Sequence, residues 1–445
     1  DLYAWTLPTG TPYAYGVWLG DTAMYVLYRL GGVALLVAIK TALVLSAYWM
    51  MVVRTRRKTG SWYLAALALG FAFAMSINNM VLRPQMWSLV PVVGYVLLLE
   101  LFVDDDIMGW WLILCPLTMV IWVNMHGAFV LGLVLLGIFA LGEVVHTLSQ
   151  ARAIRSWRKS SWLVVTAALT GSATLCNPRG IGIVTYVWEL LTDPTTQELL
   201  TDWQAPTPSG VANLTFYVSV LVFLLTLLYA RFRPTPTETL LLTSFLWLAW
   251  QGQRYIIWYG LLAMPILARA LTGLQARLPR LSARRHWANN VIAVLLFVPL
   301  VMTLPWWVER MPLPKTYWDQ VLRDTKVGPL LATDTPVAAT AYLKAHPGGN
   351  LFNELGYGSY LIWALPEQGV FIDPRVELYS DALVKDYIRL GLGIRHEELL
   401  TLYGVDRVML DRSAQEELSL ALDADPNWQL EYQDAYAEIW AKTDD

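Results

Sequence analysis

Apolar residues along this 445-residue chain gather in long runs that short polar segments separate. A helix needs about 20 predominantly apolar residues to cross a bilayer, and runs near this length predict ten membrane helices. They are expected near residues 31–53, 61–77, 86–103, 110–123, 127–145, 162–176, 214–230, 239–250, 255–271 and 289–304. The run at 110–123 is short, so a re-entrant segment is an alternative to a crossing helix there.

From about Asp334 onward, short apolar segments alternate between a strand period and a helix period. "NLFNE", "GVFID", "DRVMLD", "WQLEYQD" and "AYAEIWA" read as strands, and "GSYLIWAL", "SDALVKDYIRL" and "HEELLTLYG" read as helices. This alternation predicts a small α/β domain with a partly parallel sheet. The predicted fold class is an α-helical polytopic membrane protein with a small C-terminal α/β domain. Its predicted parts are an extracytoplasmic loop at 1–30, a transmembrane domain at 31–307 with a long loop at 177–213, a linker at 308–333 and the α/β domain at 334–445.

Two predicted strands of this domain end in polar turns, at Asn353-Glu354 and at Asp373-Pro374-Arg375. Ligands of open α/β sheets bind where parallel strands end. Asp373 and Arg375 fit a second interpretation, a structural ion pair that holds the strand end. The domain has no Gly-rich phosphate loop, nucleophile elbow or metal-ligand spacing.

The distribution of charge distinguishes the residues before Val308 from those after it, and it predicts how the first part is oriented in the membrane. From Val308 onward there are 23 acidic and 12 basic residues, whereas the preceding part has 12 acidic and 20 basic residues. Lys and Arg in short loops favour the cytoplasmic side, and basic clusters follow the first, fifth, seventh and ninth predicted helices, at 54–58, 152–159, 231–233 and 269–285. The opposite turns, at 1–28, 78–85, 124–127, 177–213 and 251–254, and everything after 304 are therefore expected to meet on the extracytoplasmic face.

Composition supports a membrane location. With 56% hydrophobic residues, the chain is too apolar for an ordinary soluble enzyme. Its two cysteines offer neither a disulfide framework nor a metal spacing. Because the chain opens at Asp1 without a methionine, we expect preceding sequence that includes a first membrane helix. The basic residues cluster in the loops between predicted helices and do not line a groove, so nucleic-acid binding is not predicted.

Polar side chains recur in the turns of the extracytoplasmic face, where burial at membrane depth is costly unless they face a protein-lined cavity. The candidates are Arg83 in "LRPQMW", Asn124 and His126 in "WVNMHG", Arg179 in "CNPRG" and Arg254 in "QGQRY". Arginine binds phosphate through paired hydrogen bonds, so three arginines around one cavity indicate an anionic ligand. Asn124 fits a helix cap equally well, His126 fits an interhelical hydrogen bond, and the arginines fit contacts with lipid headgroups.

The opening segment and the long loop add aromatic and acidic candidates. Asp1 and Asp21 are the only acidic residues in the aromatic stretch that contains Trp18. Aromatic rings stack on sugar rings and carboxylates accept protons from sugar hydroxyls, although a membrane-interface aromatic belt has the same composition. In the loop, Asp202-Trp203 follows "YVWELL", which predicts an amphipathic helix on the membrane surface.

The strings "LRPQMW", "WVNMHG", "CNPRG" and "QRY", together with "LFNELGYGSYLIW" and "VFIDPRVELYSD", carry a resemblance to a known group. The chain resembles a group of bacterial multi-pass proteins in the glycosyltransferase C superfamily. Its relatives include lipid-linked sugar transferases and protein mannosyltransferases, and the similarity covers nearly the whole chain. The resemblance implies a polyprenyl-phosphate sugar donor and an acidic general base in the first extracytoplasmic loop, a position that Asp1 or Asp21 matches. The "HEW" of the group reads "GVW" at Gly16–Trp18, so an acidic and a basic candidate are absent there.

The predicted function is an inverting glycosyl transfer from a polyprenyl-phosphate sugar to a glycan or protein acceptor on the outer face of the bacterial cytoplasmic membrane. Asp1 or Asp21 is the predicted general base. Arg83, Arg179, Arg254, Asn124, His126, Trp18 and Asp202 are the predicted substrate-binding residues. The sequence shows no ligand cluster for a divalent metal, although the reaction class admits one. The alternative is an inactive subunit that keeps the fold and docks in a membrane complex, which the "GVW" departure favours.

Overall fold

The computed structural model of the protein describes residues 3–8, 10–11, 17–150, 155–192, 201–229, 232–275, 294, 331–332 and 334–443. These residues form two compact units. The helical unit contains the described residues from 17 to 294, and the α/β unit contains residues 3–11 together with 331–443. The predicted loop at 1–30 is therefore divided between the two units.

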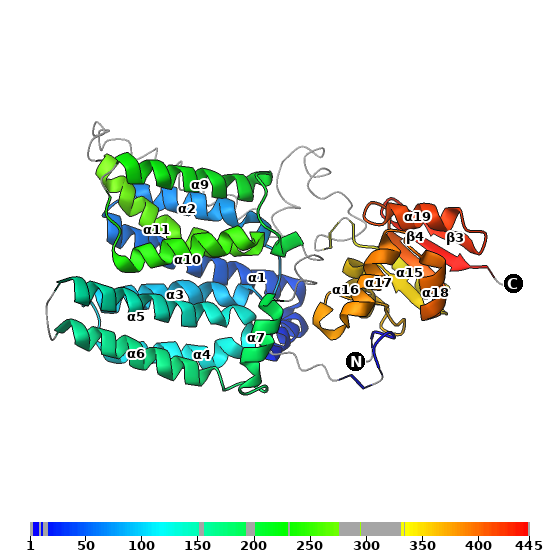
Figure 1. The fold of residues 1–445 in the computed structure, drawn as a ribbon, viewed down its shortest axis with the longest axis horizontal. Helices are drawn as coiled ribbons and strands as arrows, with labels where there is room; N and C mark the ends of the chain where they lie inside the picture. Colours follow the sequence, from blue (N-terminus) through cyan, green and yellow to red (C-terminus); the bar gives the residue numbers. More distant parts are fainter. Residues whose placement is uncertain are drawn as a thin grey trace. The chain divides into compact units, whose positions relative to one another are not determined.

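The helical unit is a bundle whose long helices run side by side (Figure 1). They are α1 (Trp18–Thr59), α2 (Trp62–Ser76), α3 (Met86–Val103), α4 (Leu114–Met125), α5 (Val130–Gln150), α6 (Arg155–Ala173), α9 (Gly210–Tyr229), α10 (Pro236–Gln251) and α11 (Ile256–Gln275). Helix α7 (Gly182–Thr192) and the short turns η1 (Ile77–Asn79), η2 (Gly109–Ile113), η3 (Gly127–Phe129), η4 (Thr201–Trp203) and η5 (Gln253–Tyr255) connect them.

Within the described residues, six helical segments are long and apolar enough to cross a membrane, and they include α1, α2, α3, α5, α9 and α11. The prediction of ten spans is thus supported only in part. Helix α10 has 16 residues, and α6 begins with the charged residues Arg155, Arg158 and Lys159, which reduce its apolar character. The run at 289–304 lies outside the described residues, apart from Val294.

Helix α1 begins at Trp18, whereas the hydropathy pattern predicts a start near residue 31. A kink at two glycines divides the helix at that point. Gly32 has a φ of 60° and a ψ of −160°, and Gly31 next to it is also non-helical. Only glycine adopts such backbone angles without steric cost. The apolar run that starts near residue 31 is therefore the second segment of α1, and Trp18–Leu30 forms a separate helical segment before the kink.

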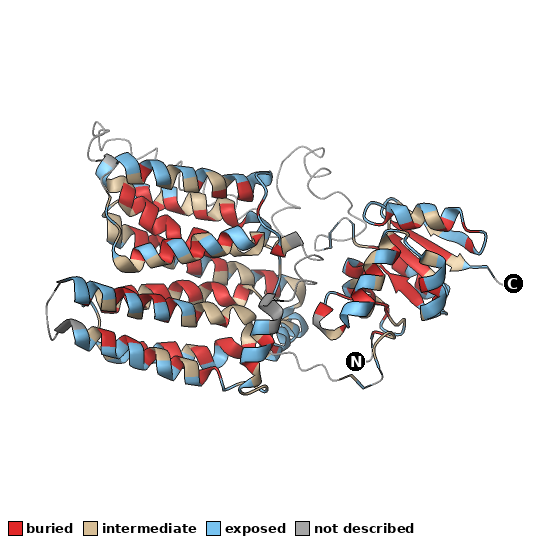
Figure 2. Ribbon diagram, viewed as in Figure 1, coloured by how far each residue is buried: buried red, intermediate tan, exposed pale blue. Residues whose placement is uncertain are grey.

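Helix α11 forms the centre of the bundle. It contacts α1, α2, α9 and α10, and every residue from Ile256 to Ala268 is buried. Figure 2 shows buried residues along most of α11, whereas the outer helices bury only one face. An apolar helix that is buried all round is expected at the core of a bundle and not at its lipid-facing surface.

Short turns after α2, α4 and α10 reverse the chain, so these turns lie at one end of the bundle together with the starts of α3, α5 and α11. Hydrogen bonds join this end to the long loop. The Asn124 side-chain amide donates to the Cys176 carbonyl at 2.7 Å, and the Gln253 N–H donates to the Gln204 carbonyl at 3.0 Å. We call it the polar end. It contains the turns at 78–85, 124–127 and 251–254 that the charge pattern assigned to one face.

The opposite end carries a buried network of charges. Arg54 Nε lies 2.9 Å from Glu100 Oε2, and Lys58 Nζ lies 3.2 Å from Glu100 Oε1. Arg54 also donates to the Leu262 carbonyl at 2.8 Å, and its side chain is fully buried. The sequence pattern placed Arg54 in a basic loop, but the residue lies inside α1 and joins it to α3 and α11.

The α/β unit packs helices against a four-stranded sheet whose order is β1-β2-β4-β3. Its elements are α15 (Val337–Ala345), β1 (Leu351–Asn353), α16 (Leu355–Ala364), η6 (Val376–Leu378), α17 (Asp381–Gly391), α18 (His396–Tyr403), β2 (Arg407–Asp411), α19 (Glu416–Asp423), β3 (Trp428–Gln433) and β4 (Ala437–Lys442). Strands β1 and β2 are parallel, and the other pairs are antiparallel. The expected small domain with a partly parallel sheet is confirmed.

The first described residues of the chain belong to this α/β unit, which the sequence pattern did not predict. Val370 of "GVFID" forms a single parallel bridge with Ala4 instead of a full strand. The Trp5 indole N–H donates to the Leu351 carbonyl at 3.1 Å, and the Thr6 hydroxyl donates to the Phe371 carbonyl at 2.6 Å. These bonds fasten the N-terminal segment to the α/β unit beside β1 and the segment around Val370.

Asp373 and Arg375 form a structural ion pair in the α/β unit. Arg375 Nε and Nη2 lie 2.8 and 2.7 Å from the two Asp373 oxygens, and the Tyr379 hydroxyl donates to Asp373 at 2.6 Å. Burial alone raises the pKa of the Asp373 carboxyl, but the hydrogen bonds from Arg375 and Tyr379 outweigh it and hold the pKa below its ordinary value. The second interpretation of these residues is the one that the structure supports.

The Asp373 pair makes the stability of the α/β unit depend on pH. A carboxyl whose pKa is depressed by folding stabilises the protein above its unfolded pKa of about 3.9 and loses that contribution as pH falls through the folded value. We therefore expect the protection factors of residues 351–379, which compare the exchange rate with the intrinsic rate at the same pH, to fall below pH 4 in the wild type. Asp373→Asn should exchange faster at pH 7 and lack the acid-dependent part of this change. An unchanged acid dependence in Asp373→Asn would contradict the assignment.

Candidate functional site

Asn124 and Trp18 bond to each other at the polar end. Trp18 Nε1 donates to Asn124 Oδ1 at 3.0 Å, and Asn124 Nδ2 donates to the carbonyls of Val120 and Cys176. Asn124 is buried, so these bonds satisfy an amide that would otherwise be costly there. Gly20 lies directly against the Met125 carbonyl, which brings the start of α1 close to the end of α4. Asn124 thus joins α1, α4 and the turn after α6.

His126 joins the turn between α4 and α5 to α3. The Ala128 N–H donates to His126 Nδ1 at 3.2 Å, and Ser88 Oγ lies 2.9 Å from the same nitrogen. Because Trp122 Nε1 donates to Ser88 Oγ, the Ser88 hydroxyl proton is directed to Nδ1, and the imidazole proton is assigned to Nε2. Burial, and secondly the positive charge of Arg254, lower the pKa of His126 to about 3. The ring is therefore neutral at physiological pH.

Arg83 and Arg254 approach each other through the long loop. Arg83 forms an ion pair with Asp202, and the Arg254 guanidinium lies 4.2 Å from the ring centroid of the adjacent Trp203. Both partners in the Arg83–Asp202 pair are about half exposed, at 56% and 48%. The structure therefore brings together three of the predicted residues, Arg83, Arg254 and Asp202, at the adjacent positions Asp202 and Trp203.

Arg179 lies in a second group, next to Asn124. Its guanidinium lies 4.4 Å from the ring centroid of Tyr186 in α7, and its backbone N–H donates to Asn177 Oδ1 at 2.7 Å. The Asn177 turn follows Cys176, whose carbonyl accepts from Asn124. Helix α7 runs across the end of the bundle (Figure 1) and buries Ile183 and Tyr186 while other residues of the helix are exposed. This confirms that the long loop contains an amphipathic helix.

The two predicted general bases differ in how far they can be placed. Asp21 lies in the first turn of α1, three residues after Trp18, and its side chain is exposed. Residues at this spacing share one face of a helix, so Asp21 is near the Trp18–Asn124 contact. Asp21 has no ion-pair partner in the part of the chain that the structure describes. Asp1 lies outside the described residues.

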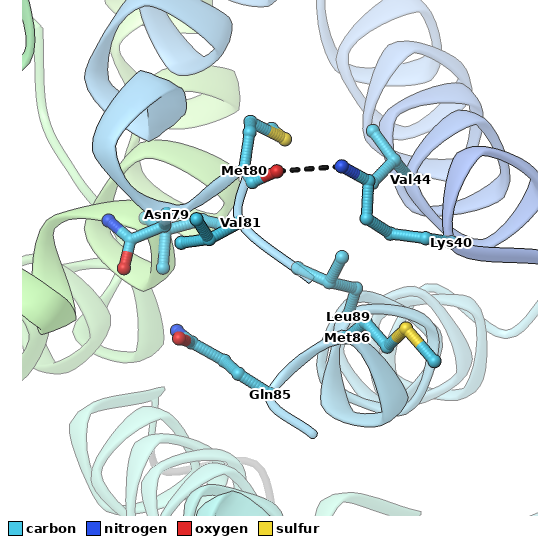
Figure 3. A pocket seen from close by; sticks show the side chains of 9 residues that line it. Lys40, Val44, Asn79, Met80, Val81, Gln85, Met86 and Leu89 are labelled. Atoms are coloured by element: carbon cyan, nitrogen blue, oxygen red, sulfur yellow. Dashed lines mark hydrogen bonds between the residues drawn. The ribbon is translucent and has the colours of Figure 1, made fainter. Parts of the chain in front are cut away.

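A small pocket opens beside the Arg83 turn, between α1 and α3. It is lined by Lys40, Val44, Asn79, Met80, Val81, Gln85, Met86, Leu89 and Ile257. Figure 3 shows Lys40 entering from α1, while Asn79 and Gln85 lie on the side of the η1 turn and the start of α3. Arg83, His126 and Arg254 are not among its lining residues.

Sequence patterns did not identify two contributors to this region. Trp203 was recognised only as part of an acidic-aromatic loop, whereas it forms the surface on which Arg254 stacks. Lys40 was counted as part of an apolar run. The one signal for Lys40 was its position as a lone cation within "VALLVAIKTALVL", where a charged residue is uncommon and marks a functional site by default.

The described residues of the polar end contain no group that fits a metal ion, and the only such group found among the described residues lies in the α/β unit. The ligand atoms of His396, Glu397 and Asp425 lie within 4.8 Å of one another. However, Asp425 Oδ1 already accepts hydrogen bonds from the backbone and side chain of Asn427, and Glu397 is exposed. We assign no metal to this group.

Comparisons with known proteins identify the fold. No protein-family model matches the chain, and no curated protein matches it in sequence. The archaeal oligosaccharyltransferase AglB from Archaeoglobus fulgidus, solved with an inhibitory peptide and a dolichol-phosphate, superimposes with a TM-score of 0.51 and 11% identity, covering 100% of this chain and 68% of that one. The apo form of the A. fulgidus oligosaccharyltransferase gives a TM-score of 0.49 at 12% identity, with the same coverage. The chain therefore shares the overall fold of the first of these two structures.

Proposed function

We propose that this protein is an inverting membrane glycosyltransferase of the bacterial cytoplasmic membrane. It transfers a sugar from a polyprenyl-phosphate donor to a glycan or protein acceptor on the extracytoplasmic face, where the α/β unit also lies. The observation that supports this most strongly is the superposition of the entire chain on an oligosaccharyltransferase solved with dolichol-phosphate and a peptide. The clustering of Arg83 and Arg254 at one end of the bundle supports the same reaction.

The two arginines are suited to the departing phosphate. As the sugar–oxygen bond breaks, negative charge builds on the phosphate, and fixed cations stabilise that charge. Arg83 is held by Asp202 in an exposed ion pair, and such pairs contribute about 1 kcal/mol or less. A phosphate can therefore replace Asp202 as the partner of Arg83. Arg254 uses the face of its guanidinium for Trp203, and a guanidinium donates hydrogen bonds from its edge.

Asp21 is the proposed general base, with Asp1 as the alternative. A carboxylate within hydrogen-bonding reach accepts the proton of the acceptor hydroxyl as the new bond to the sugar forms. Trp18, on the same helical turn as Asp21, offers a ring on which a sugar can stack. Asn124 and His126 hold these elements in place through their bonds to Trp18 and Ser88.

The second candidate is a non-catalytic subunit of a membrane complex. The observation that favours it is that Trp18, Asn124 and His126 direct polar groups to one another or to neighbouring protein groups. Under this proposal, the polar end is a structural joint, and changes to its arginines affect assembly without affecting sugar transfer.

Sugar transfer by the purified protein distinguishes these proposals. The assay supplies synthetic polyprenyl-phosphate sugars and a cell-envelope extract as acceptor, and it measures the polyprenyl phosphate released. We expect Arg83→Ala and Arg254→Ala each to lower the rate by about a hundredfold, the effect of removing one group that stabilises a developing oxyanion. Arg57→Ala is the matched control, because Arg57 forms a similarly exposed pair with Asp106 outside the polar end. Release by none of the donors tested would favour the subunit.

A further inference from the structure

The η4 turn of the long loop is fastened to the η5 turn by buried contacts. Trp203 is buried, and the Arg254 guanidinium lies 4.2 Å from its ring centroid. The Trp203 and Tyr255 rings meet edge to face, with 6.1 Å between their centroids. The Gln253 N–H donates to the Gln204 carbonyl at 3.0 Å. None of these contacts uses the acidic residue of the η4 turn.

Asp202 makes an exchangeable contact from the same turn. It pairs with Arg83, and both side chains are about half exposed, so the pair contributes about 1 kcal/mol or less. Among the described residues, no other carboxylate forms an ion pair with Arg83. Because the neighbouring Trp203 is fixed, Asp202 stays at a high effective concentration beside Arg83 and returns to the guanidinium whenever it is free. Asp202 is therefore an anion that competes for Arg83 and cannot diffuse away.

The proposed sugar transfer changes the charge of the phosphate that Arg83 binds. The bond between the sugar and the phosphate oxygen breaks, and its electron pair stays on that oxygen. The acceptor oxygen forms the new bond to the sugar, and its proton passes to the general base. The donor phosphodiester carries about one negative charge, whereas the released monoester carries about 1.5–2 at pH 7. Cations that stabilise the developing charge therefore bind the product more tightly than the donor, and slow product release is the expected consequence.

We propose that Asp202 promotes release of the polyprenyl phosphate product by competing with its phosphate for Arg83. This inference rests on the proposed function, because it needs a product that carries a phosphate. The donor phosphate displaces Asp202 from Arg83 on binding, and after transfer Asp202 returns to the guanidinium as the product leaves. Trp203 keeps its stack on Arg254 throughout, so the turn stays on the bundle. Asp202 thus weakens phosphate binding, the opposite of the substrate-binding role that the sequence predicts.

Binding of radiolabelled polyprenyl monophosphate to the purified full-length protein in detergent tests this role. We expect Asp202→Asn to lower the Kd by about three- to fivefold, which corresponds to the loss of a competing pair of about 1 kcal/mol or less. Asp202→Glu keeps the competing charge and should bind within about twofold of the wild type. Asp106→Asn is the matched control, because it makes the same change in a similarly exposed pair with Arg57 outside the polar end.

Product inhibition measures the same competition during turnover. Added polyprenyl phosphate should inhibit sugar transfer by Asp202→Asn at concentrations about three- to fivefold lower than those that inhibit the wild type. The first turnover at saturating donor should keep its rate, because Asp202 has already been displaced when the sugar moves. A slower first turnover would give Asp202 a role in the transfer step and overturn the proposal.

Two binding results also overturn the proposal. Unchanged or weaker binding of polyprenyl phosphate by Asp202→Asn would mean that the carboxylate is inert or positions Arg83. Equal tightening of polyprenol, which has the chain without the phosphate, would mean that the substitution alters the turn and does not act through charge. Tighter phosphate binding by Asp202→Asn in a protein that transfers no sugar would refute the proposed function and leave the competition between Asp202 and phosphate in place.

Discussion

Replacing Glu100 by glutamine lowers the free energy of unfolding of the helical bundle by about 3–5 kcal/mol, the cost of breaking a buried ion pair by removing one partner. Glu100 forms ion pairs with Arg54 and Lys58 of α1, and the Arg54 side chain is fully buried. Without the carboxylate, Arg54 retains only the Leu262 carbonyl as a described acceptor, and its charge stays uncompensated. Unfolding in mixed detergent and SDS micelles, followed by the reactivity of the buried Cys115 in a Cys176→Ser background, measures the loss.

Asp106→Asn provides the matched control for Glu100→Gln. Asp106 pairs with Arg57 of the same helix, but both side chains are largely exposed. An exposed pair contributes about 1 kcal/mol or less, so the same change from acid to amide should have little effect. Equal losses in the two variants would mean that burial does not determine the strength of the network, and the role assigned to Arg54 would be wrong.

The sequence predicted which turns lie together at one end of the bundle, because basic residues concentrate in the loops on one side of a membrane. Basic clusters after alternate helices separated the turns into two sets, and Arg83, His126 and Arg254 lie at the same end of the bundle. Several helix boundaries were less predictable. Gly31 and Gly32 interrupt α1 without interrupting its apolar pattern, so hydropathy located the second segment and missed the first.

Partners of polar side chains were harder to predict than their positions. Asn124 was recognised as a costly buried amide, but sequence spacing carries no information about the Cys176 carbonyl, which lies 52 residues away. In the sequence, Arg54 is indistinguishable from the other basic residues of the cluster at 54–58. The structure shows that Arg54 is buried and pairs with Glu100. The N-terminal segment is the clearest case, since the Trp5 indole and the Leu351 carbonyl are 346 residues apart. Contacts at such separations depend on tertiary packing, which local periodicity does not encode.

Asp21→Asn is expected to reduce kcat for sugar transfer by a factor of about a hundred to ten thousand, the usual contribution of a general base. The substitution keeps the size of the side chain but removes its ability to accept a proton from the acceptor hydroxyl. Initial rates at saturating polyprenyl-phosphate sugar measure the effect, and donor binding should be unchanged because Asp21 is not proposed to contact the phosphate.

A structural role for Asp21 predicts a different result. An acidic residue in the first turn of a helix stabilises the helix dipole by about 0.3–1 kcal/mol, so a structural Asp21 would change the midpoint of unfolding slightly and leave kcat intact. Asp1→Asn, measured in parallel, tests the other carboxylate. A large loss in Asp1→Asn with a normal rate in Asp21→Asn would transfer the role of base to Asp1. Normal rates in both would require a base outside the first extracytoplasmic segment, and the assignment of this end as the site of proton transfer would then fail.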